Sequence, residues 1–375
     1  MATLVLADDL TGACDAALPF VTTGRRVRVG IRTPPREPAD VTVVSTESRD
    51  LPAGPAADAV LRALSALPTG SGGATLLKKV DSRLRGPVAA ELAAALRGSG
   101  RPYAVVTPAL PRLDRIVEDG VLRAPGAPPL DIVSLLGGIT PSGVATVSAA
   151  DDAAVLAAAI ETRGRQADVV VADARTDGEL ATLAAALAAL HPLPLVAGSS
   201  GLAAAIAAQG AGGTGRSGPP VQPARRLLFV LGSLDPALRR QAQRLLAERP
   251  VAHVALGSRP TGPPASESVL LECVLDATAS PDGGAKARSL ARAAAALLRE
   301  DAFDAVVCSG GAVAAAVCEE LGVDALELLA EIGPGFAQAR IAPDAGPPLL
   351  ALRSGGFGGD NDLVEAFDRL SEEAS

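Results

Sequence analysis

The chain has 375 residues, a formal net charge of −8 and a sequence pI of about 5.0. This acidic balance argues against general binding to nucleic acid or to a membrane surface, because both require a basic face. Aromatic residues make up 2% of the chain and tryptophan is absent, so the core must be built from Ala, Val, Leu and Ile. The length suffices for two ordinary domains.

The four cysteines form no CxxC pair, and only two histidines accompany them, so a Cys/His zinc site is not expected. We expect the cysteines to be small buried residues of a cytoplasmic protein. The N-terminal apolar run is too short for a signal peptide, and no uncharged apolar stretch approaches the length of a membrane span. The cysteines are Cys14, Cys273, Cys308 and Cys318.

In the first half of the chain, short Val- and Leu-rich runs alternate with longer Ala- and Leu-rich runs of helical period. Continuous apolar strands between helices indicate a mostly parallel sheet covered on both faces. The predicted strands are Thr3–Ala7, Val27–Ile31, Val41–Ser45, Thr75–Val80, Tyr103–Thr107, Asp168–Ala172 and Pro194–Ala197. The predicted helices are Gly12–Thr22, Ala56–Ala66, Pro87–Arg97, Ala150–Arg163, Asp177–Leu190 and Gly201–Ala208. The Pro/Gly-rich segment Pro108–Pro141 is predicted to be an irregular functional loop or lid.

A Gly- and Pro-rich run, Gly210–Pro220, is typical of a linker. Its G-x-G-x-x-G match follows a helix rather than a strand, so it does not predict a dinucleotide site. A second α/β block follows, with predicted strands Leu227–Leu231, Val251–Ala255, Ser268–Leu275, Phe303–Ser309 and Leu349–Leu352. Its predicted helices are Pro236–Ala247, Ala285–Arg299, Ala312–Leu321 and Asn361–Leu370. We therefore predict two α/β domains with mostly parallel sheets and an interdomain cleft: residues 1–209, a linker 210–223, and residues 224–375.

Acidic residues follow the first predicted strand. Asp8 and Asp9 stand at its end, Thr11-Gly12 open the next helix, and Asp15 lies one turn further. Ligands of open α/β sheets bind beyond the carboxyl ends of the strands, where adjacent acids suit a metal, a substrate hydroxyl or a proton acceptor. The alternative is a helix N-cap, which Asp9 or Thr11 would form well, but a cap explains one acid and not three.

A basic cluster follows the fourth predicted strand and runs from Lys78 to Gly86, with the sequence Lys-Lys-Val-Asp-Ser-Arg-Leu-Arg-Gly. Two of the chain's three lysines lie in it. Four cations around one carboxylate repel one another unless an anion or buried carboxylates complete them, so the cluster predicts an anion site. A solvated basic loop is the alternative.

Three glycine turns follow predicted strands of the second block: Gly232-Ser233, Gly310-Gly311 and Gly355-Gly356. Such turns expose backbone N–H groups at a helix N-terminus and can hold phosphate. No G-x-x-x-x-G-K-[ST] sequence occurs, so the chain is not a P-loop enzyme. Acids and cations in one block and glycine turns in the other are the layout of a small-molecule kinase.

In these motifs the chain resembles the four-carbon acid sugar kinase family, which phosphorylates D-threonate, D-erythronate and 3-oxo-tetronate. The matching stretches run in family order: Ala7–Asp15, Lys78–Gly86, Gly198–Ala203, Gly232-Ser233, Gly310-Gly311, Pro334-Gly335 and Ser354–Gly358. The resemblance implies an N-terminal acid-sugar domain and a C-terminal ATP domain. It also implies transfer of the ATP γ-phosphate, with Mg²⁺, to the terminal hydroxyl of a four-carbon aldonate.

Carried onto this sequence, the resemblance implies a set of site residues. Asp9 and Asp81 would face the substrate, and we hypothesise that Asp9, or else Asp81, takes the proton of the acceptor hydroxyl. The residues facing the acid sugar would be Asp8, Ser48, Arg49, Lys79, Ser82, Arg85 and Arg115. Those facing ATP would be Ser233, Gly310, Gly311, Ala312, Val313, Gly355 and Gly356. No protein metal ligand is assigned.

The chain departs from the family pattern at several positions. Ala312-Val313 stand where the family has an acidic or polar residue and Thr, and Arg353 stands for the family Lys. Pro87 stands where Asn is common, and Asp114 stands where Gly is usual. A non-catalytic binding homologue and a metal-dependent hydrolase or aldolase using Asp8, Asp9 and Asp15 remain as alternatives. The sequence leaves the oligomeric state open, with a homodimer as one option.

Overall fold

The computed structural model describes residues 2–67, 73–138, 141–209, 219–232, 235–256, 268–272, 283–300, 302–341, 348–353 and 358–372. The chain divides into two compact units, Met1–Arg216 and Ser217–Ser375. The predicted linker residues 210–218 lie outside the described residues, and the predicted domain limits stay predictions.

The first unit contains a wholly parallel sheet of eight described strands, which confirms the predicted α/β class. Its strand order reverses on either side of β1 and β4, so the chain winds over both faces of the sheet. In spatial order the strands are β2 (Val27–Ile31), β3 (Val41–Ser45), β1 (Thr3–Ala7), β4 (Thr75–Lys79), β11 (Leu195–Gly198), β5 (Ala104–Thr107), β10 (Val169–Ala172) and β9 (Val144–Val147).

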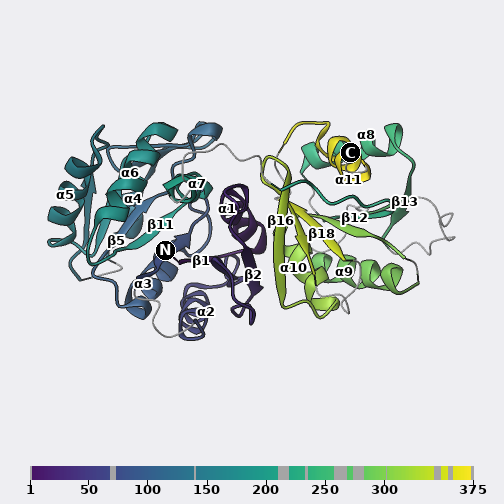
Figure 1. The fold of residues 1–375 in the computed structure, drawn as a ribbon, viewed down its shortest axis with the longest axis horizontal. Helices are drawn as coiled ribbons and strands as arrows, with labels where there is room; N and C mark the ends of the chain where they lie inside the picture. The colour runs from purple at the N-terminus through teal and green to yellow at the C-terminus, as the bar shows by residue number, and fades with distance from the viewer. Residues whose placement is uncertain are drawn as a thin grey trace. The chain divides into compact units, whose positions relative to one another are not determined.

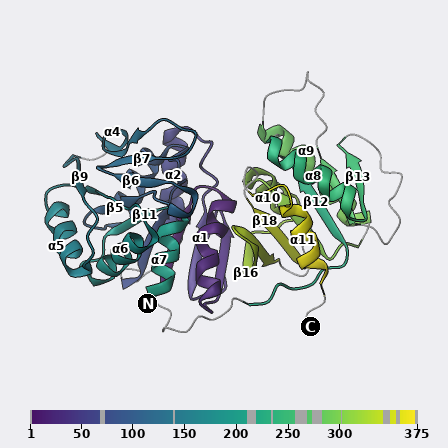
Figure 2. The same ribbon diagram turned by 90° about the horizontal axis from the view of Figure 1, so that it is seen from above.

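Helices cover this sheet in two groups. One group packs in a row along one side of the sheet and consists of α5 (Ala153–Gly164), α6 (Asp177–Ala189), α7 (Ser200–Gln209) and α1 (Leu10–Thr22) (Figure 2). The other is the pair α2 (Ala53–Ser65) and α3 (Val88–Ser99). Strands buried on both faces explain why the predicted strands are continuous apolar runs.

The segment Pro108–Pro141 was predicted to be irregular, and that part of the prediction was wrong, because its described residues form regular elements. Its predicted functional role stays a prediction. The segment holds a small antiparallel sheet and a short helix: β6 (Ile116–Glu118), β7 (Val121–Arg123), β8 (Leu130–Asp131) and α4 (Ile132–Leu136). Asp119 and Gly120 join β6 to β7 with positive φ angles of 53° and 73°, the conformation that a two-residue hairpin requires. The Asp-Gly pair was a usable signal, but strands of two or three residues are too short to show a period.

The second unit is also α/β, but its sheet is mixed. Five parallel strands are followed by two antiparallel ones, in the order β13 (Val251–Ala255), β14 (Ser268–Glu272), β12 (Leu227–Leu231), β15 (Ala305–Ser309), β18 (Leu349–Arg353), β17 (Phe336–Arg340) and β16 (Ala325–Gly333). The long hairpin of β16 and β17 was not predicted, because Glu, Leu and Ala in Ala325–Gly333 favour a helix by propensity. Alternating burial along β16 shows the strand period that overrides this propensity.

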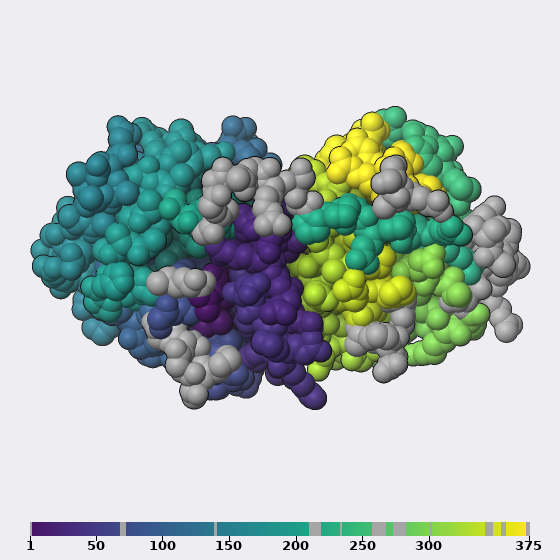
Figure 3. Space-filling view, viewed as in Figure 1, coloured from purple at the N-terminus to yellow at the C-terminus, as the bar shows by residue number. Residues whose placement is uncertain are grey.

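Helices lie on both faces of this second sheet. In Figure 1, α8 (Pro236–Glu248) and α11 (Asp362–Ser371) pack together on one side, and α9 (Gly283–Glu300) and α10 (Gly311–Glu320) on the other. The yellow residues of α11 reach the surface beside α8 (Figure 3). The buried core is aliphatic apart from a few aromatic residues such as Phe20 and Phe229, as the composition predicts.

The cysteines that the structure describes are buried, as the sequence predicted. Cys14, Cys308 and Cys318 are free and buried, and Cys273 lies outside the described residues. Within the described part of the chain, no helix combines the length and the apolar character needed to cross a membrane.

Candidate active site

The acidic pair Asp8 and Asp9 lies between the end of β1 and the start of α1. Asp9 is the N-cap of α1: its carboxylate accepts a hydrogen bond from Gly12 N at 2.8 Å and another from Thr11 Oγ1 at 2.9 Å. The cap therefore accounts for Asp9's position. Asp8 is buried and takes no part in the cap.

Arg49 joins the two aspartates. Its Nε and Nη2 atoms donate to the two oxygens of Asp8, each at 2.8 Å, and Nη1 donates to Asp9 at 2.5 Å. The turn after β3 brings Arg49 here, because Ser48 N and Arg49 N both donate to the carbonyl oxygen of Asp8. A bidentate guanidinium pair of this kind fixes both partners in direction as well as in distance.

Lys79, the last residue of β4, completes the group. A β-carbon placed on Gly12 would lie 2.4 Å from Asp9 Oδ1 and 3.4 Å from both Arg49 Nη2 and Lys79 Nζ. These three polar atoms therefore surround the first turn of α1, and only glycine leaves room for them. Lys79 is buried, and its ammonium donates to the carbonyl oxygen of Val80 at 3.0 Å.

The two aspartates differ in acidity. Burial would raise the pKa of Asp8, but the Arg49 hydrogen bonds and the charges of Lys78, Arg49 and Lys79 outweigh it and lower the pKa. For Asp9, burial dominates and, with the negative charge of Asp8, raises the pKa above its usual value despite Arg49. Two adjacent carboxyls held at different pKa values are typical of acid and base sites.

Asp81 and Arg85 form a second pair within the basic cluster. Arg85 donates to both oxygens of Asp81, at 3.1 and 2.7 Å, and the backbone N–H of Arg83 adds a bond of 2.9 Å. Burial opposes ionisation of Asp81, yet the bonds and charge of Arg85 win and hold its pKa far below the usual value. Such a carboxylate is a poor proton acceptor, so of the two predicted bases Asp9 is the better suited.

Ser82 and Arg115 are also brought together. Arg115 Nη1 donates to Ser82 Oγ, and both residues are buried. Arg115 follows Asp114, which ends a 3₁₀ turn, Pro111–Leu113, with a positive φ of 53°. The family usually has glycine at this position, and glycine adopts the left-handed conformation easily. Asp114 adopts the same conformation, which aspartate tolerates better than most residues do. Gly86, with φ of 88°, packs against the backbone of Arg49, and a β-carbon there would lie 3.0 Å from Arg49 O.

A buried network below these residues was not predicted. Lys78 is fully buried and pairs with Glu91 of α3, with 2.9 Å between Lys78 Nζ and Glu91 Oε2. Glu91 also accepts a hydrogen bond from Ser48 Oγ, and Ser48 contacts Thr46 at 2.6 Å. The network anchors the turn that carries Arg49. Sequence patterns could not reveal it, because Glu91 occupies an ordinary helix position.

Glu47 is a further carboxyl near the aspartates that sequence reasoning missed. Glu47 lies in the turn after β3 that also carries Arg49. It has a positive φ of 49° and accepts a hydrogen bond from Ser45 Oγ at 2.5 Å. Burial raises its pKa to about 7, with Asp9 and Asp8 adding to the shift. Non-glycine residues adopt this left-handed conformation uncommonly.

In the second unit, the turn between β15 and α10 has the geometry of an anion site. Gly310 is the N-cap residue of α10 and has a φ of 106°, which residues with a side chain rarely adopt. Gly311 begins the helix, so free N–H groups of its first turn follow directly. Ser309 ends β15 and is buried, and its Oγ has no hydrogen-bond partner among the described residues.

The two family departures next to this turn have different surroundings. Ala312 is exposed in the first turn of α10, and Val313 is buried. Val313 packs on Gly232 at the end of β12, where a β-carbon would lie 2.2 Å from Val313 Cγ2. Glycine at 232 is therefore required by the packing of a neighbouring turn. The predicted residues Ser233, Gly355 and Gly356 lie outside the described residues.

Arg353 ends β18 and is buried. It donates to Asp362 Oδ2 at 2.7 Å and to Gln241 Oε1, and its guanidinium lies 5.6 Å from the ring centroid of Phe336. These contacts tie the end of β18 to α11 and α8. The planar, multi-donor head of arginine suits this role, which a lysine could not fill in the same way.

Comparison with known protein families matches both units. Residues 3–206 match a sugar-binding N-terminal domain, and residues 274–363 match a nucleotide-binding C-terminal domain. The matches cover the acid and cation residues in the first unit and the Gly310-Gly311 turn in the second.

Relatives of known function match along the whole chain. A D-threonate kinase from Bordetella bronchiseptica is 32% identical, over 98% of this chain and 97% of its own length. A 3-oxo-tetronate kinase from Methylobacterium radiotolerans is 30% identical, over 98% of both chains. Among solved structures, a Salmonella typhimurium protein has a TM-score of 0.78 at 23% identity, over 98% of both chains. A Haemophilus influenzae protein has a TM-score of 0.74 at 23% identity, over 98% of this chain and all of its own. These two structural likenesses establish the fold.

Proposed function

Since the chain belongs to the four-carbon acid sugar kinase family, we propose that it transfers the γ-phosphate of ATP to the terminal hydroxyl of a four-carbon acid sugar. The acceptor is of the threonate, erythronate or 3-oxo-tetronate type, and the relatives that match are named for two of these. Residues 1–209 form the acid-sugar domain, 210–223 the linker and 224–375 the nucleotide domain. The observation that carries the proposal is the grouping of Asp8, Asp9, Arg49 and Lys79 around the first turn of α1.

The acid sugar is held by charged side chains. Arg85, with more than half of its side chain exposed, and Arg115 supply guanidinium groups for the carboxylate. Lys79 and Arg49 neutralise the charge that gathers near the reacting hydroxyl. Asp8 and Ser48 hold Arg49 and its turn in place, and Ser82 does the same for Arg115.

Asp9 orients the terminal hydroxyl and takes its proton. Its raised pKa makes it a stronger base than an ordinary aspartate, while the α1 cap and Arg49 keep its oxygens in fixed directions. Phosphoryl transfer depends mainly on alignment and charge neutralisation, so one well-placed carboxylate is sufficient chemistry for the acceptor. Asp81 orients Arg85.

The nucleotide is held mainly by backbone groups. Gly310 and Gly311 offer N–H groups at the start of α10, and Ser233, Gly355 and Gly356 belong to turns of the same kind in the sequence. Ala312 has no polar side chain and Val313 packs inward, so neither side chain contacts the nucleotide through a polar group. The backbone N–H groups therefore carry the binding.

Mg²⁺ would neutralise the β- and γ-phosphates when bound with ATP. The described residues contain no group of three or more His, Cys, Asp and Glu side chains placed for a metal ion. The donor set therefore fits an ion held mostly by phosphate oxygens and water, as is usual for Mg²⁺ in kinases.

The test is ADP formation with purified protein, ATP and Mg²⁺ over D-threonate, D-erythronate and 3-oxo-tetronate, with the product identified by phosphorus NMR. We expect a phosphomonoester at the terminal carbon. The 4-deoxy acid, which lacks the acceptor hydroxyl, is the control and should bind without consuming ATP. ADP formation on none of these acids, with nucleotide binding retained, would instead favour the non-catalytic binding homologue to which Ala312 and Val313 point.

A further inference from the structure

A cavity of ≈ 180 Å³ lies in the first unit, away from the candidate active site. Thr3 and Thr75, the first residues of β1 and β4, line it, whereas Asp8 and Lys79 lie at the opposite ends of these strands. A five-residue strand spans about 16 Å at about 3.3 Å per residue. The cavity is therefore at the amino edge of the parallel sheet and cannot share a ligand with the acid and cation cluster at the carboxyl edge.

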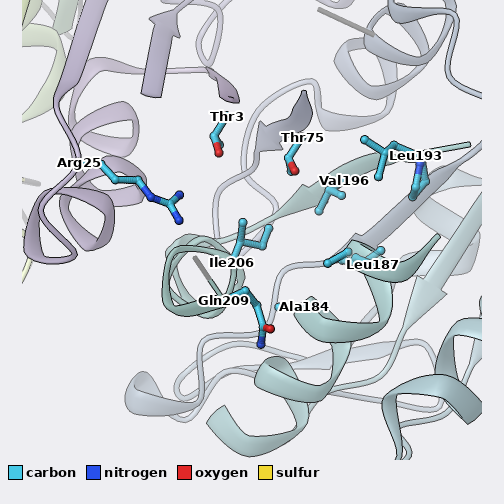
Figure 4. Close-up of a pocket in the computed structure, with 11 residues that line it drawn as sticks. Thr3, Arg25, Thr75, Ala184, Leu187, Leu193, Val196, Ile206 and Gln209 are labelled. Carbon is cyan, nitrogen blue, oxygen red and sulfur yellow. The ribbon is translucent and has the colours of Figure 1, made fainter. Parts of the chain in front are cut away.

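Most of the cavity wall is apolar. Helices α6 and α7 and strand β11 supply it, together with the segment before β11. Figure 4 shows aliphatic side chains on several sides of one space; they are Leu187, Leu193, Val196 and Ile206. An engineered apolar cavity of about 150 Å³ is large enough for benzene, so this one has room for a short branched hydrocarbon body.

Two hydroxyl groups face this space. Thr3 and Thr75 are partners in the β1–β4 register, so their side chains stand next to each other. Thr3 is only 4% exposed and Thr75 is half-buried. Figure 4 shows both hydroxyl oxygens turned toward the cavity. Each hydroxyl can donate one hydrogen bond to a molecule in the cavity and accept others from it.

A guanidinium group stands at the same cavity. Arg25 lies in the turn after α1, where Gly24 has a φ of 81° and Arg25 N donates to Phe20 O at 3.1 Å. Its guanidinium carbon lies 5.3 Å from the Phe20 ring centroid, and Figure 4 shows the group pointing into the cavity. No carboxylate among the described residues forms an ion pair with Arg25.

A second guanidinium group adds positive charge behind the cavity wall. Arg101 donates to the carbonyl oxygens of Ala74, at 2.6 Å, and of the lining residue Leu193, at 3.2 Å. Burial lowers its pKa, and within the described residues it too has no ion-pair partner. In a chain of net charge −8, two arginines without carboxylates at one edge indicate a place for an anion.

We propose that this cavity binds a small aliphatic carboxylate, with the carboxyl group at Arg25, Thr3 and Thr75 and the branched hydrocarbon tail against α6, α7 and β11. One lining guanidinium and two hydroxyls match the charge and the oxygens of a carboxylate. A phosphate dianion is a poorer match, because the rest of the wall is apolar and would leave its other oxygens without donors. The cavity is a second small-molecule site, separate from that for the acid sugar.

The test is calorimetric titration of the full chain with 4-methylpentanoate. We expect saturable binding that weakens at least about tenfold in Arg25→Gln, which removes a charged hydrogen bond. Arg26→Gln, an exposed neighbour, is the matched control and should bind as the wild type does. The neutral analogue 4-methylpentanamide should bind about tenfold more weakly than the acid. Ala188→Phe, at an exposed lining residue of α6, should block the cavity.

Two results would overturn the proposal. One is the absence of saturable binding in the millimolar range. The other is binding that is lost in Arg85→Gln and kept in Arg25→Gln, because the probe would then occupy the acid-sugar site. Circular-dichroism melting of each variant checks folding; if Arg25→Gln does not fold, the amide probe and Ala188→Phe decide the outcome, and unchanged affinity in both refutes the site.

Discussion

At the carboxyl ends of β1, β3 and β4 the polar groups are charged side chains, whereas at the end of β15 they are mainly the backbone amides of a glycine turn. The first arrangement depends on the identity of Asp8, Asp9, Arg49 and Lys79. The second depends on a backbone shape that glycine alone adopts easily. Substitution therefore acts differently in the two units: a changed side chain removes chemistry from the first, while Ala312 and Val313 leave the Gly310-Gly311 turn intact in the second.

The largest effect is expected at Asp9. Asp9→Asn keeps the helix cap, since Asn caps as well as Asp, but removes the proton acceptor. We expect turnover on the acid sugar to fall by about 10²- to 10⁴-fold, with ATP affinity unchanged. Steady-state kinetics and ATP titration measure both. Asp152→Asn, at the N-cap of α5, is the matched control and should keep full turnover; a mutant at position 9 that keeps most of its rate would rule out Asp9 as the base.

The next largest effect, on stability, is expected at the buried ion pair of Lys78 and Glu91. Glu91→Ala leaves Lys78 charged and fully buried, so the free energy of unfolding should fall by about 3–5 kcal/mol in urea denaturation. The double variant Lys78→Met with Glu91→Leu removes both charges and should be much less destabilised. If the single and double variants lose the same stability, the pair does not act as a buried ion pair.

The difference in stability between the wild type and Glu47→Gln is expected to depend on pH. The pKa of Glu47 in the folded protein is about 7, above the ordinary value, so the folded state holds a proton that the unfolded state releases. Its contribution to stability is therefore fully present at low pH and is lost as the pH rises through about 7. Glu47→Gln should be near neutral at about pH 4 and stabilising by up to about 3 kcal/mol at about pH 8. Urea denaturation of both proteins at the two pH values checks this, and a difference that does not change with pH contradicts it.

A smaller, kinetic effect is expected at Arg85. Arg85→Gln should raise KM for the acid sugar by about 10- to 100-fold and change kcat little, because a carboxylate clamp acts equally in ground and transition states. Arg165→Gln is the control, since Arg165 is also an exposed arginine in an i,i+4 ion pair. Equal KM values for the two variants would remove Arg85 from the substrate site.

The sequence could predict those strands and site residues that are marked by a local pattern of apolar and polar residues. The strands β1, β2, β3, β12 and β13 have the predicted bounds, because each is a short run that is mostly apolar between turn or helix residues. The aspartate pair and the basic cluster were visible for the same reason, as polar residues placed directly after such runs. The predicted kinase family and the predicted mostly parallel α/β fold are confirmed.

What the sequence could not predict depends on contacts between distant segments. Glu91 is 43 residues from the Ser48 hydroxyl that it accepts a bond from, and nothing in its own helix marks it as buried. The strand β16 carries helix-forming residues, and its pairing with β17 fixes it as a strand. The cavity at the amino edge joins β1, β4, α6 and α7, which no local pattern connects.

The most direct test of side-chain binding in one unit and backbone binding in the other is calorimetric titration of two variants with D-threonate and, separately, with ATP. Gly310→Ala strains a φ of 106° without a steric clash, and Gly322→Ala, at a φ of 68° beyond the other end of α10, is its control. We predict that Gly310→Ala weakens ATP binding by about tenfold and leaves D-threonate binding unchanged, whereas Arg85→Gln does the reverse. Loss of D-threonate binding in Gly310→Ala with ATP binding intact would contradict the account.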